Sequence, residues 1–231
     1  MAAFPTTRWT LIRQATMPTP ESARALESPC QQYSGPVLAF VRHRVATTEK
    51  AEDIAQGFFA KLLERDLLER ADEDRGRFRT FLLHALRGFM ADVHDFDTAQ
   101  KRGGGKQVVS FANSAVLEPQ HAVTADQQFE LQWVRTLLSR SVQRLQEEYK
   151  TSGKAELFES LRKSLDSDSA PPAREIAAQL KMSEPAVRVA MHRMRKRLGQ
   201  IIRTEIAETV PRASDVDDEL SRLMQILETR A

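Results

Sequence analysis

The stretch from Ala173 to Leu198 constrains the fold more than any other part of the chain, because it predicts two short helices joined by a tight turn. The turn falls at residues 181–183, where Ser183 is placed to accept a hydrogen bond from the free N–H groups that begin the second helix. Pro185 fits the first turn of that helix, where its missing N–H donor is not needed. Apolar residues recur at the spacing of one helix face and predict a single buried seam. They are Ile176, Ala177, Leu180, Val187, Ala190, Met191, Met194 and Leu198.

The outer face of the second helix is strongly basic. From Glu184 to Arg203 the sequence holds six Lys or Arg residues and one acid. A small helix pair with an apolar seam and a cationic outer face is typical of a helix-turn-helix that reads DNA. A surface helix with solvated charges is the alternative, but the cap, turn length and seam together favour DNA binding. The candidate DNA-binding residues are Glu184, Arg188, His192, Arg193, Arg195 and Lys196, with Arg203 expected after the end of the helix.

Composition excludes several classes of function. The chain of 231 residues has 34 basic and 32 acidic residues, so only the local concentration of positive charge points to nucleic acid. The single Cys30 excludes an internal disulfide and a multi-thiolate zinc site. The three glycines at 103–105 and Lys106 precede Gln107 rather than Ser or Thr, so they do not form a phosphate loop. No other catalytic or metal-ligand motif is found, and we expect no enzyme activity, metal or cofactor.

Helical periodicity predicts an all-α protein with two helical units and a flexible linker. The first unit is expected to contain a helix over 26–46 that is interrupted or kinked near Gly35 and Pro36, and a helix from Thr48 to about 65–69. A polar loop over 71–79 and a helix from Phe78 or Thr80 to about 95 follow. A second unit opens near Asp126. After Pro211 a last helix is expected, with Ser214 and Asp217 spaced as its cap.

With these pieces in order, the chain resembles an extracytoplasmic function sigma factor of bacterial RNA polymerase, in the sigma-70 family. The resemblance is carried by KAEDIAQGFFAKLLER (50–65), by GRFRTFLLHAL (76–86) with Asp92, and by the helix-turn-helix. The stretch FFAKLLER (58–65) and the long tail also resemble a subgroup found beside Ser/Thr protein kinases. The implied division is an N-terminal extension (1–25), a sigma region 2-like domain (26–99), a linker (100–124), a region 4-like helix-turn-helix domain (125–208) and a C-terminal helical tail (209–231).

The resemblance assigns roles to two parts of the first domain. One polar helix face carries residues at spacings of three, four and seven, and the family docks this face on the clamp of the polymerase. These residues are Glu49, Glu52, Asp53 and Gln56. The loop before the third helix (72–79) is implied to capture an unstacked −10 base, and residues 87–94 of that helix are implied to contact the melted DNA. The candidate residues are Arg75, Arg77, Arg79 and Arg87. Phe78 is expected to be a core anchor rather than a base-stacking residue. Gly88 stands where the family often has Asn, which leaves the −10 bases that are read open.

Two threonines at the start of the acidic helix are candidate phosphorylation sites. Thr47 and Thr48 begin the acidic helix, where a phosphate would meet free N–H groups and enlarge the acidic patch; a plain N-cap is the alternative. The expected partners are RNA polymerase core and promoter DNA, with a Ser/Thr kinase or an anti-sigma factor as a regulator. No apolar run predicts a membrane span, and the bacterial cytoplasm is the expected compartment. A stand-alone helix-turn-helix regulator and a kinase-regulated adaptor remain open as alternative functions.

Overall fold

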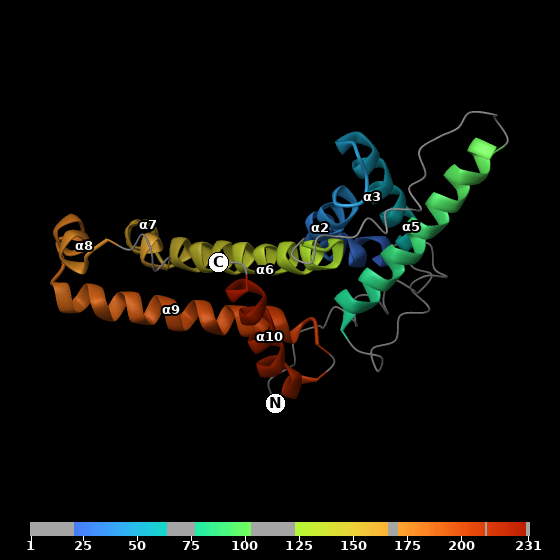
Figure 1. The fold of residues 1–231 in the computed structure, drawn as a ribbon. Helices are drawn as coiled ribbons and strands as arrows, with labels where there is room; N and C mark the ends of the chain where they lie inside the picture. Colours follow the sequence, from blue (N-terminus) through green and yellow to red (C-terminus); the bar gives the residue numbers. More distant parts are fainter. Residues whose placement is uncertain (1–20, 64–76, 103–122, 166–170, 211, 230–231) are drawn as a thin grey trace. The chain divides into compact units, whose positions relative to one another are not determined.

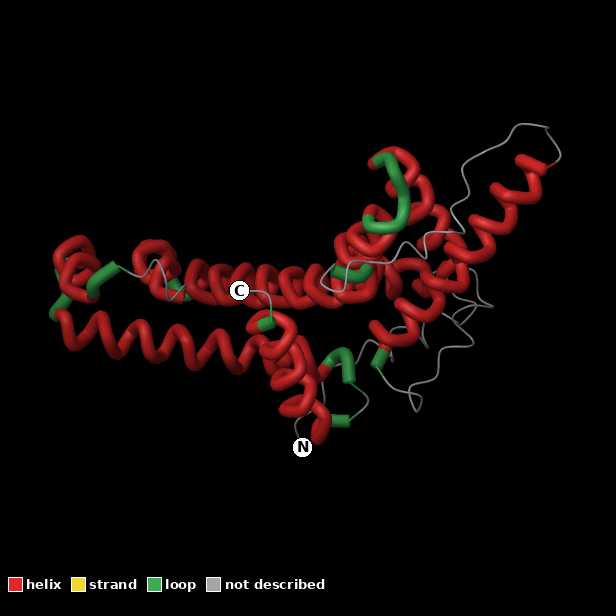
Figure 2. Tube along the Cα trace, in the orientation of Figure 1, coloured by secondary structure: helices red, strands yellow, loops and turns green. Residues whose placement is uncertain are grey.

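The computed structural model describes residues 21–63, 77–102, 123–165, 171–210 and 212–229. All regular secondary structure in these ranges is helical, which confirms the predicted all-α class (Figures 1 and 2). The chain divides into two compact units. Unit 1 comprises Met1–Arg135 and Ala207–Ala231, and unit 2 comprises Thr136–Ile206. The tail helix therefore groups with the N-terminal part of the chain, whereas the sequence suggested a separate tail; the functional domain boundaries stay a prediction.

Unit 1 begins with three helices, α2 (Glu21–Arg42), α3 (Thr48–Leu63) and α5 (Phe78–Arg102). Helix α2 packs against α3, and α3 packs against α5. Helix α2 is not interrupted at Gly35 and Pro36, because it continues through both residues. Val37, Phe40 and Val41 just after the proline are fully buried, and their packing outweighs the local loss of one helical hydrogen bond at the proline. The end predicted for α3, between 65 and 69, lies outside the described residues.

The core of unit 1 is aromatic and lies between these helices. The ring of Phe58 lies 5.7 Å from that of Phe89, between ring centroids. A Cβ atom on Gly57 would lie 3.3 Å from the Phe89 ring, so a glycine here lets α3 approach α5 closely. Phe78 is 1% exposed and meets Tyr33 edge to face at 5.3 Å, which confirms it as a core anchor. Helix α5 starts at Phe78, so the predicted loop ends before that residue, and the helix runs seven residues past the expected end at 95.

Unit 1 is completed by the first part of α6 (Ala125–Thr151), by the short 3₁₀ helix η4 (Ala213–Asp215) and by α10 (Val216–Glu228). A capping box begins α6, since Thr124 and Gln127 exchange backbone-to-side-chain hydrogen bonds of 2.9 and 3.2 Å. The predicted cap of the last helix is wrong. Ser214 lies inside η4, and its hydroxyl contacts the carboxylate of Asp215 at 3.2 Å instead of capping α10.

Unit 2 contains the rest of α6, α7 (Ala155–Arg162), η3 (Lys163–Leu165), α8 (Ala173–Leu180) and α9 (Glu184–Ala207). Gly153 adopts φ +69° just after α6 and ends that helix. The predicted seam of the helix pair is confirmed, because its residues are buried or pack against one core. That core comprises Leu145, Phe158, Leu161, Ile176, Ala177, Val187, Met194 and Ile201.

Two further facts bear on function. No described helix combines the length and the apolar character that a membrane crossing requires. Within the described ranges, no cluster of His, Cys, Asp and Glu side chains has the arrangement of a metal site.

Candidate functional site

The turn between α8 and α9 has the geometry that the sequence predicted. Lys181 takes the left-handed conformation, with φ 51° and ψ 39°, and the N–H of Met182 donates to the carbonyl of Ala177 at 3.0 Å. The hydroxyl of Ser183 accepts a hydrogen bond of 3.4 Å from the N–H of Ala186, in the first turn of α9. Ser183 is therefore the N-cap of the second helix. This turn fixes where α9 begins and which of its faces points outward.

The outward face of α9 carries a row of cationic groups. Arg188, His192 and Lys196 follow one another at four-residue intervals, so they lie along one line of the helix surface. All three are exposed, and the Arg188 side chain is 71% exposed with an ion pair to Glu184 at 2.5 Å. His192, Lys196 and the neighbouring Arg193 have no hydrogen-bond or ion-pair partner among the described residues. We name Arg188, His192 and Lys196 the cationic row.

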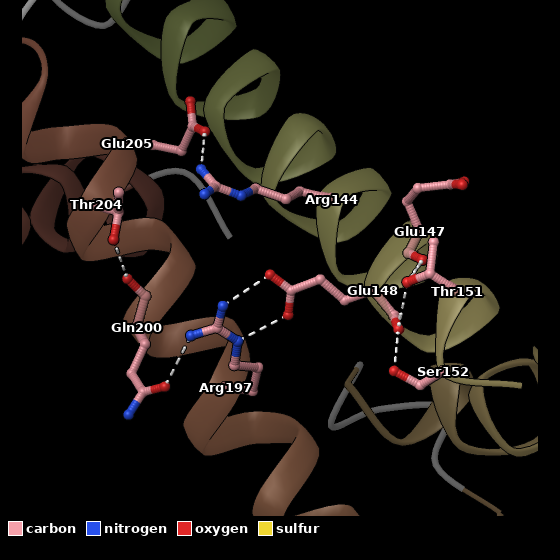
Figure 3. A network of polar contacts seen from close by, with 9 residues as sticks. All are labelled: Arg144, Glu147, Glu148, Thr151, Ser152, Arg197, Gln200, Thr204 and Glu205. Carbon is pink, nitrogen blue, oxygen red and sulfur yellow. Dashed lines mark hydrogen bonds and ion pairs between the residues drawn. The ribbon is translucent and has the colours of Figure 1, made fainter. Parts of the chain in front are cut away.

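Two arginines on the flanks of α9 are bound within unit 2 instead. Arg195 donates to the carbonyl of Ser164 in η3 at 2.5 Å. Arg197 holds both carboxylate oxygens of Glu148 in α6 at 2.7 Å, and also donates to the side chain of Gln200 at 3.1 Å (Figure 3). This hydrogen bond lowers the pKa of Glu148 below its ordinary value. No sequence signal identifies the pair, because its partners are 49 positions apart.

A second polar tie joins the same two helices near the end of α9. The buried carboxylate of Glu205 accepts a hydrogen bond of 3.2 Å from Arg144 (Figure 3). The same carboxylate lies 3.8 Å from Arg140. Arg203, expected beyond the helix, is inside α9, which runs to Ala207. Together the two ties fix the rotation of α9 about its axis, so that the cationic row stays on the outside.

Arg193 lies apart from the cationic row. It borders a hollow of about 650 Å³ between the end of α6, α7 and the start of α9. Apolar side chains supply most of the wall, including Tyr149, Leu157 and Val189. The side chain of Val189 is 48% exposed there. Arg193 is therefore directed to a different surface from Arg188 and Lys196, although the sequence grouped all three.

The acidic face predicted in unit 1 is formed by α3. Glu49, Glu52, Asp53 and Gln56 are all exposed, while Ala51, Ile54, Ala55, Phe58 and Leu62 on the other side are buried. Glu52 makes a surface ion pair with Arg42 at 3.3 Å, with both side chains about half exposed. The hydroxyl of Thr47 accepts a hydrogen bond of 3.3 Å from the N–H of Lys50, so Thr47 is the N-cap and Thr48 is the first helical residue.

The arginines near the start of α5 are held in a different way from those of α9. Arg79 is 1% exposed, pairs with Glu219 of α10 and with Glu130 of α6 at 3.3 Å, and stacks on the ring of Trp133 at 4.7 Å. Arg77 is 27% exposed and lies 2.9 Å from the second oxygen of Glu219. Carboxylates and an aromatic ring enclose the guanidinium of Arg79 in this conformation, and its assignment to DNA stays a prediction.

Arg75 and Arg87 are the other two arginines predicted to contact the −10 DNA. Arg75 lies outside the described residues. Arg87 is about half exposed and pairs with Asp126 at the start of α6. Neither the enclosure of Arg79 nor the carboxylate partners at 126, 130 and 219 could be read from the sequence, since each partner lies on a helix distant along the chain.

Helices α2, α3 and α5 thus form a small all-α domain with one acidic face. Comparison with family models matches residues 30–95 of this domain to Sigma-70 region 2. This segment is a sigma-70 region 2 domain, which supports a role of the chain in transcription initiation with RNA polymerase and DNA. The comparisons with curated proteins and with solved structures give no match.

Proposed function

We propose that the protein is an extracytoplasmic function sigma factor, a promoter-specificity subunit that works with RNA polymerase core. The observation that supports this most is the region 2 match over 30–95, on the same helices that present the acidic face. A simple repressor has no use for such a domain. The bacterial cytoplasm follows as the proposed compartment, because core polymerase and promoters are there.

Docking on the polymerase is assigned to the acidic face of α3. Glu49, Asp53 and Gln56 have no hydrogen-bond or ion-pair partner among the described residues, so their polar groups are available to a basic surface. Glu52 is held only by an exposed pair with Arg42, and such pairs contribute little to stability. A rigid helix with several carboxylates on one face suits charge-steered docking.

Promoter reading is divided between the two units. The cationic row of α9 is assigned to the −35 element, with Arg188 near the N-terminal end of the helix reaching base edges and Lys196 meeting phosphate. The −10 element is assigned to Arg77 before α5 and to Arg79 and Arg87 within it. In this conformation each of these arginines is engaged by a carboxylate from another helix, whereas within the described ranges no residue of the cationic row is.

Control by a Ser/Thr kinase is part of the same proposal. A phosphate on Thr47 or Thr48 would add about −1.5 to −2 charges at the N-terminal end of α3, beside Glu49. Both threonines are exposed, as modification requires. We expect the Ala variants at both positions to lose transcription from a cognate promoter under inducing conditions, and the Glu variants to retain it. Full activity of the Ala variants would remove phosphorylation at these threonines from the proposal.

Charge reversal of the acidic face tests the docking step. The double variant Glu52→Lys/Asp53→Lys should lose co-purification with RNA polymerase core while its circular dichroism spectrum stays that of the parent. Glu147→Lys/Glu156→Lys is the matched control, because it makes the same change of charge on exposed helical positions of unit 2. Retained co-purification of the first variant would contradict the assigned face. Sequence-specific duplex binding without core, unaffected by the reversal, would instead support a stand-alone regulator.

A further inference from the structure

The carboxylate of Glu219 is enclosed between two arginines that the proposed function assigns to DNA. Its side chain is 0% exposed, although it lies in the first turn of the tail helix α10. One oxygen pairs with Arg79, and the other lies 2.9 Å from the Nε atom of Arg77. A buried glutamate with both oxygens engaged is a specific contact between α10 and the start of α5.

A second carboxylate extends this contact. Glu130 of α6 lies 3.3 Å from Arg79 and accepts a hydrogen bond of 3.2 Å from Arg222 of α10. The resulting group, which we name the arginine cluster, contains three guanidinium groups and two carboxylates. Its members are Arg77, Arg79, Arg222, Glu130 and Glu219. The two glutamates therefore pair with guanidinium groups that could otherwise bind a phosphate group in the same geometry.

Within the described part of the chain, α10 has few fully buried side chains apart from this cluster. Glu219 and Leu223 are its only buried residues, and Met224 of the same helix is 53% exposed. A buried ion cluster contributes little net stability, because the cost of removing the charges from water offsets most of their attraction. A helix attached mainly in this way can leave when another polyanion supplies the same contacts.

We propose that α10 is a built-in cover that competes with DNA for Arg77 and Arg79. While Glu219 is seated, the start of α5 is closed to a DNA strand; when α10 leaves, the guanidinium groups become available to phosphates. The inference rests on the proposed function, since it concerns the arginines assigned to the −10 element. It adds that the C-terminal helix regulates this contact from within the chain.

The test uses the full chain and a short fluorescein-labelled single-stranded oligodeoxynucleotide, measured by fluorescence anisotropy. Arg188→Ala/Lys196→Ala serves as the background, so that the cationic row of α9 contributes little to binding. In this background Glu219→Gln should bind the oligonucleotide at least about threefold more tightly, because it removes the competing charge. Asp218→Asn is the matched control, since it removes one exposed acid from the same turn of α10. It should leave the affinity unchanged.

Adding Arg77→Ala to Glu219→Gln should abolish the gain. A gain that survives Arg77→Ala, or a folded Glu219→Gln variant that binds no more tightly than Asp218→Asn, overturns the proposal. Should Glu219→Gln fail to fold by circular dichroism, Arg222→Gln takes its place. Arg222 is 42% exposed and attaches the same helix from its edge, so a smaller gain is expected and the absence of any gain overturns the proposal.

Chemical modification of arginine separates this proposal from the one on which it rests. Phenylglyoxal labelling of Arg77, read by mass spectrometry, should rise in Glu219→Gln and not in Asp218→Asn. Unchanged labelling overturns the cover itself. Increased labelling without Arg77-dependent DNA binding would instead remove the DNA contact assigned to Arg77, and with it the competition. Co-purification with polymerase core plays no part in either readout.

Discussion

Arg188 of α9 and Arg79 of α5 are the same residue type in two opposite environments. The Arg188 side chain is 71% exposed and shares only a surface ion pair with Glu184, whereas Arg79 is 1% exposed among two carboxylates and the Trp133 ring. The first keeps its hydration and offers donors to a ligand. The second is buried, and its ion-pair partners lie inside unit 1. An arginine is therefore available for nucleic acid only where no carboxylate from another helix reaches it.

The difference also separates two uses of burial. Removing a guanidinium from water is costly, so Arg79 is stable in its position only because Glu130 and Glu219 supply compensating charge. Arg188 needs no such compensation, and its loss leaves no buried charge behind. Substitutions at the two positions should consequently change different properties of the protein.

The largest expected effect is the loss of stability in Arg79→Ala. The substitution leaves Glu219 and Glu130 without a main partner, and breaking a buried ion pair costs about 3–5 kcal/mol of the free energy of unfolding. Arg188→Ala should change that free energy by less than about 0.5 kcal/mol, as exposed substitutions do. Urea unfolding followed by Trp133 fluorescence in a Trp9→Phe background measures both. Equal stability of the two variants would contradict the enclosure of Arg79.

The next largest effect concerns DNA binding, for which Arg188 rather than Arg79 is expected to matter more. Arg188→Ala should weaken binding to a cognate −35 duplex by about 1–3 kcal/mol and relax the sequence preference at one position. Lys196→Ala should weaken binding to all sequences alike and reduce the slope of log affinity against log salt by about 1. Binding isotherms at several salt concentrations distinguish the two roles. A uniform loss in Arg188→Ala would place that residue on phosphate rather than on a base.

The smallest effect concerns Arg197, which is exposed by 47% and yet paired with Glu148. The folded pKa of Glu148 is lowered by this hydrogen bond, so the pair contributes stability above the ordinary pKa of a glutamate and loses it as the pH falls through the lowered value. Arg197→Gln should cost at most about 1 kcal/mol near pH 7, because solvent screens the pair.

The difference in melting temperature between Arg197→Gln and the parent should shrink as the pH falls below about 4, where the carboxylate becomes protonated. Arg162→Gln is the control, because Arg162 and Glu159 form a more open pair at 3.5 Å on α7. A melting difference that stays constant down to low pH would show that Arg197 acts through packing rather than through the charge of Glu148.

Most of the fold was predictable because the sequence signals of helices, their periodicity, caps and turns, are local. The turn at Lys181, the cap at Ser183 and the seam through Val187 and Met194 follow from short-range rules, and all are present. The wrong predictions concern places where tertiary packing determines the local structure. Burial of the residues after Pro36 carries α2 through a proline, and the 3₁₀ turn around Ser214 displaces the expected cap. Neither result follows from the local sequence.

The candidate site divides along the same line. Helical spacing placed the acidic face of α3 and the cationic row of α9 correctly on exposed surfaces. It could not tell Arg188 from Arg79, because that distinction depends on Glu219, which is 140 positions from Arg79. Long-range charge pairing has no periodicity, so a basic residue near a motif is only a candidate until its carboxylate partners are known.

The left-handed conformation of Lys181 can be compared with the substitutions that its codon permits. A residue with a Cβ atom in this conformation costs roughly 1–2 kcal/mol, and asparagine is among the few side chains that adopt it readily. Either lysine codon becomes an asparagine codon by a change of its third base. A single base change would therefore give a less strained turn. Lysine at this position instead keeps a positive charge directly before the recognition helix.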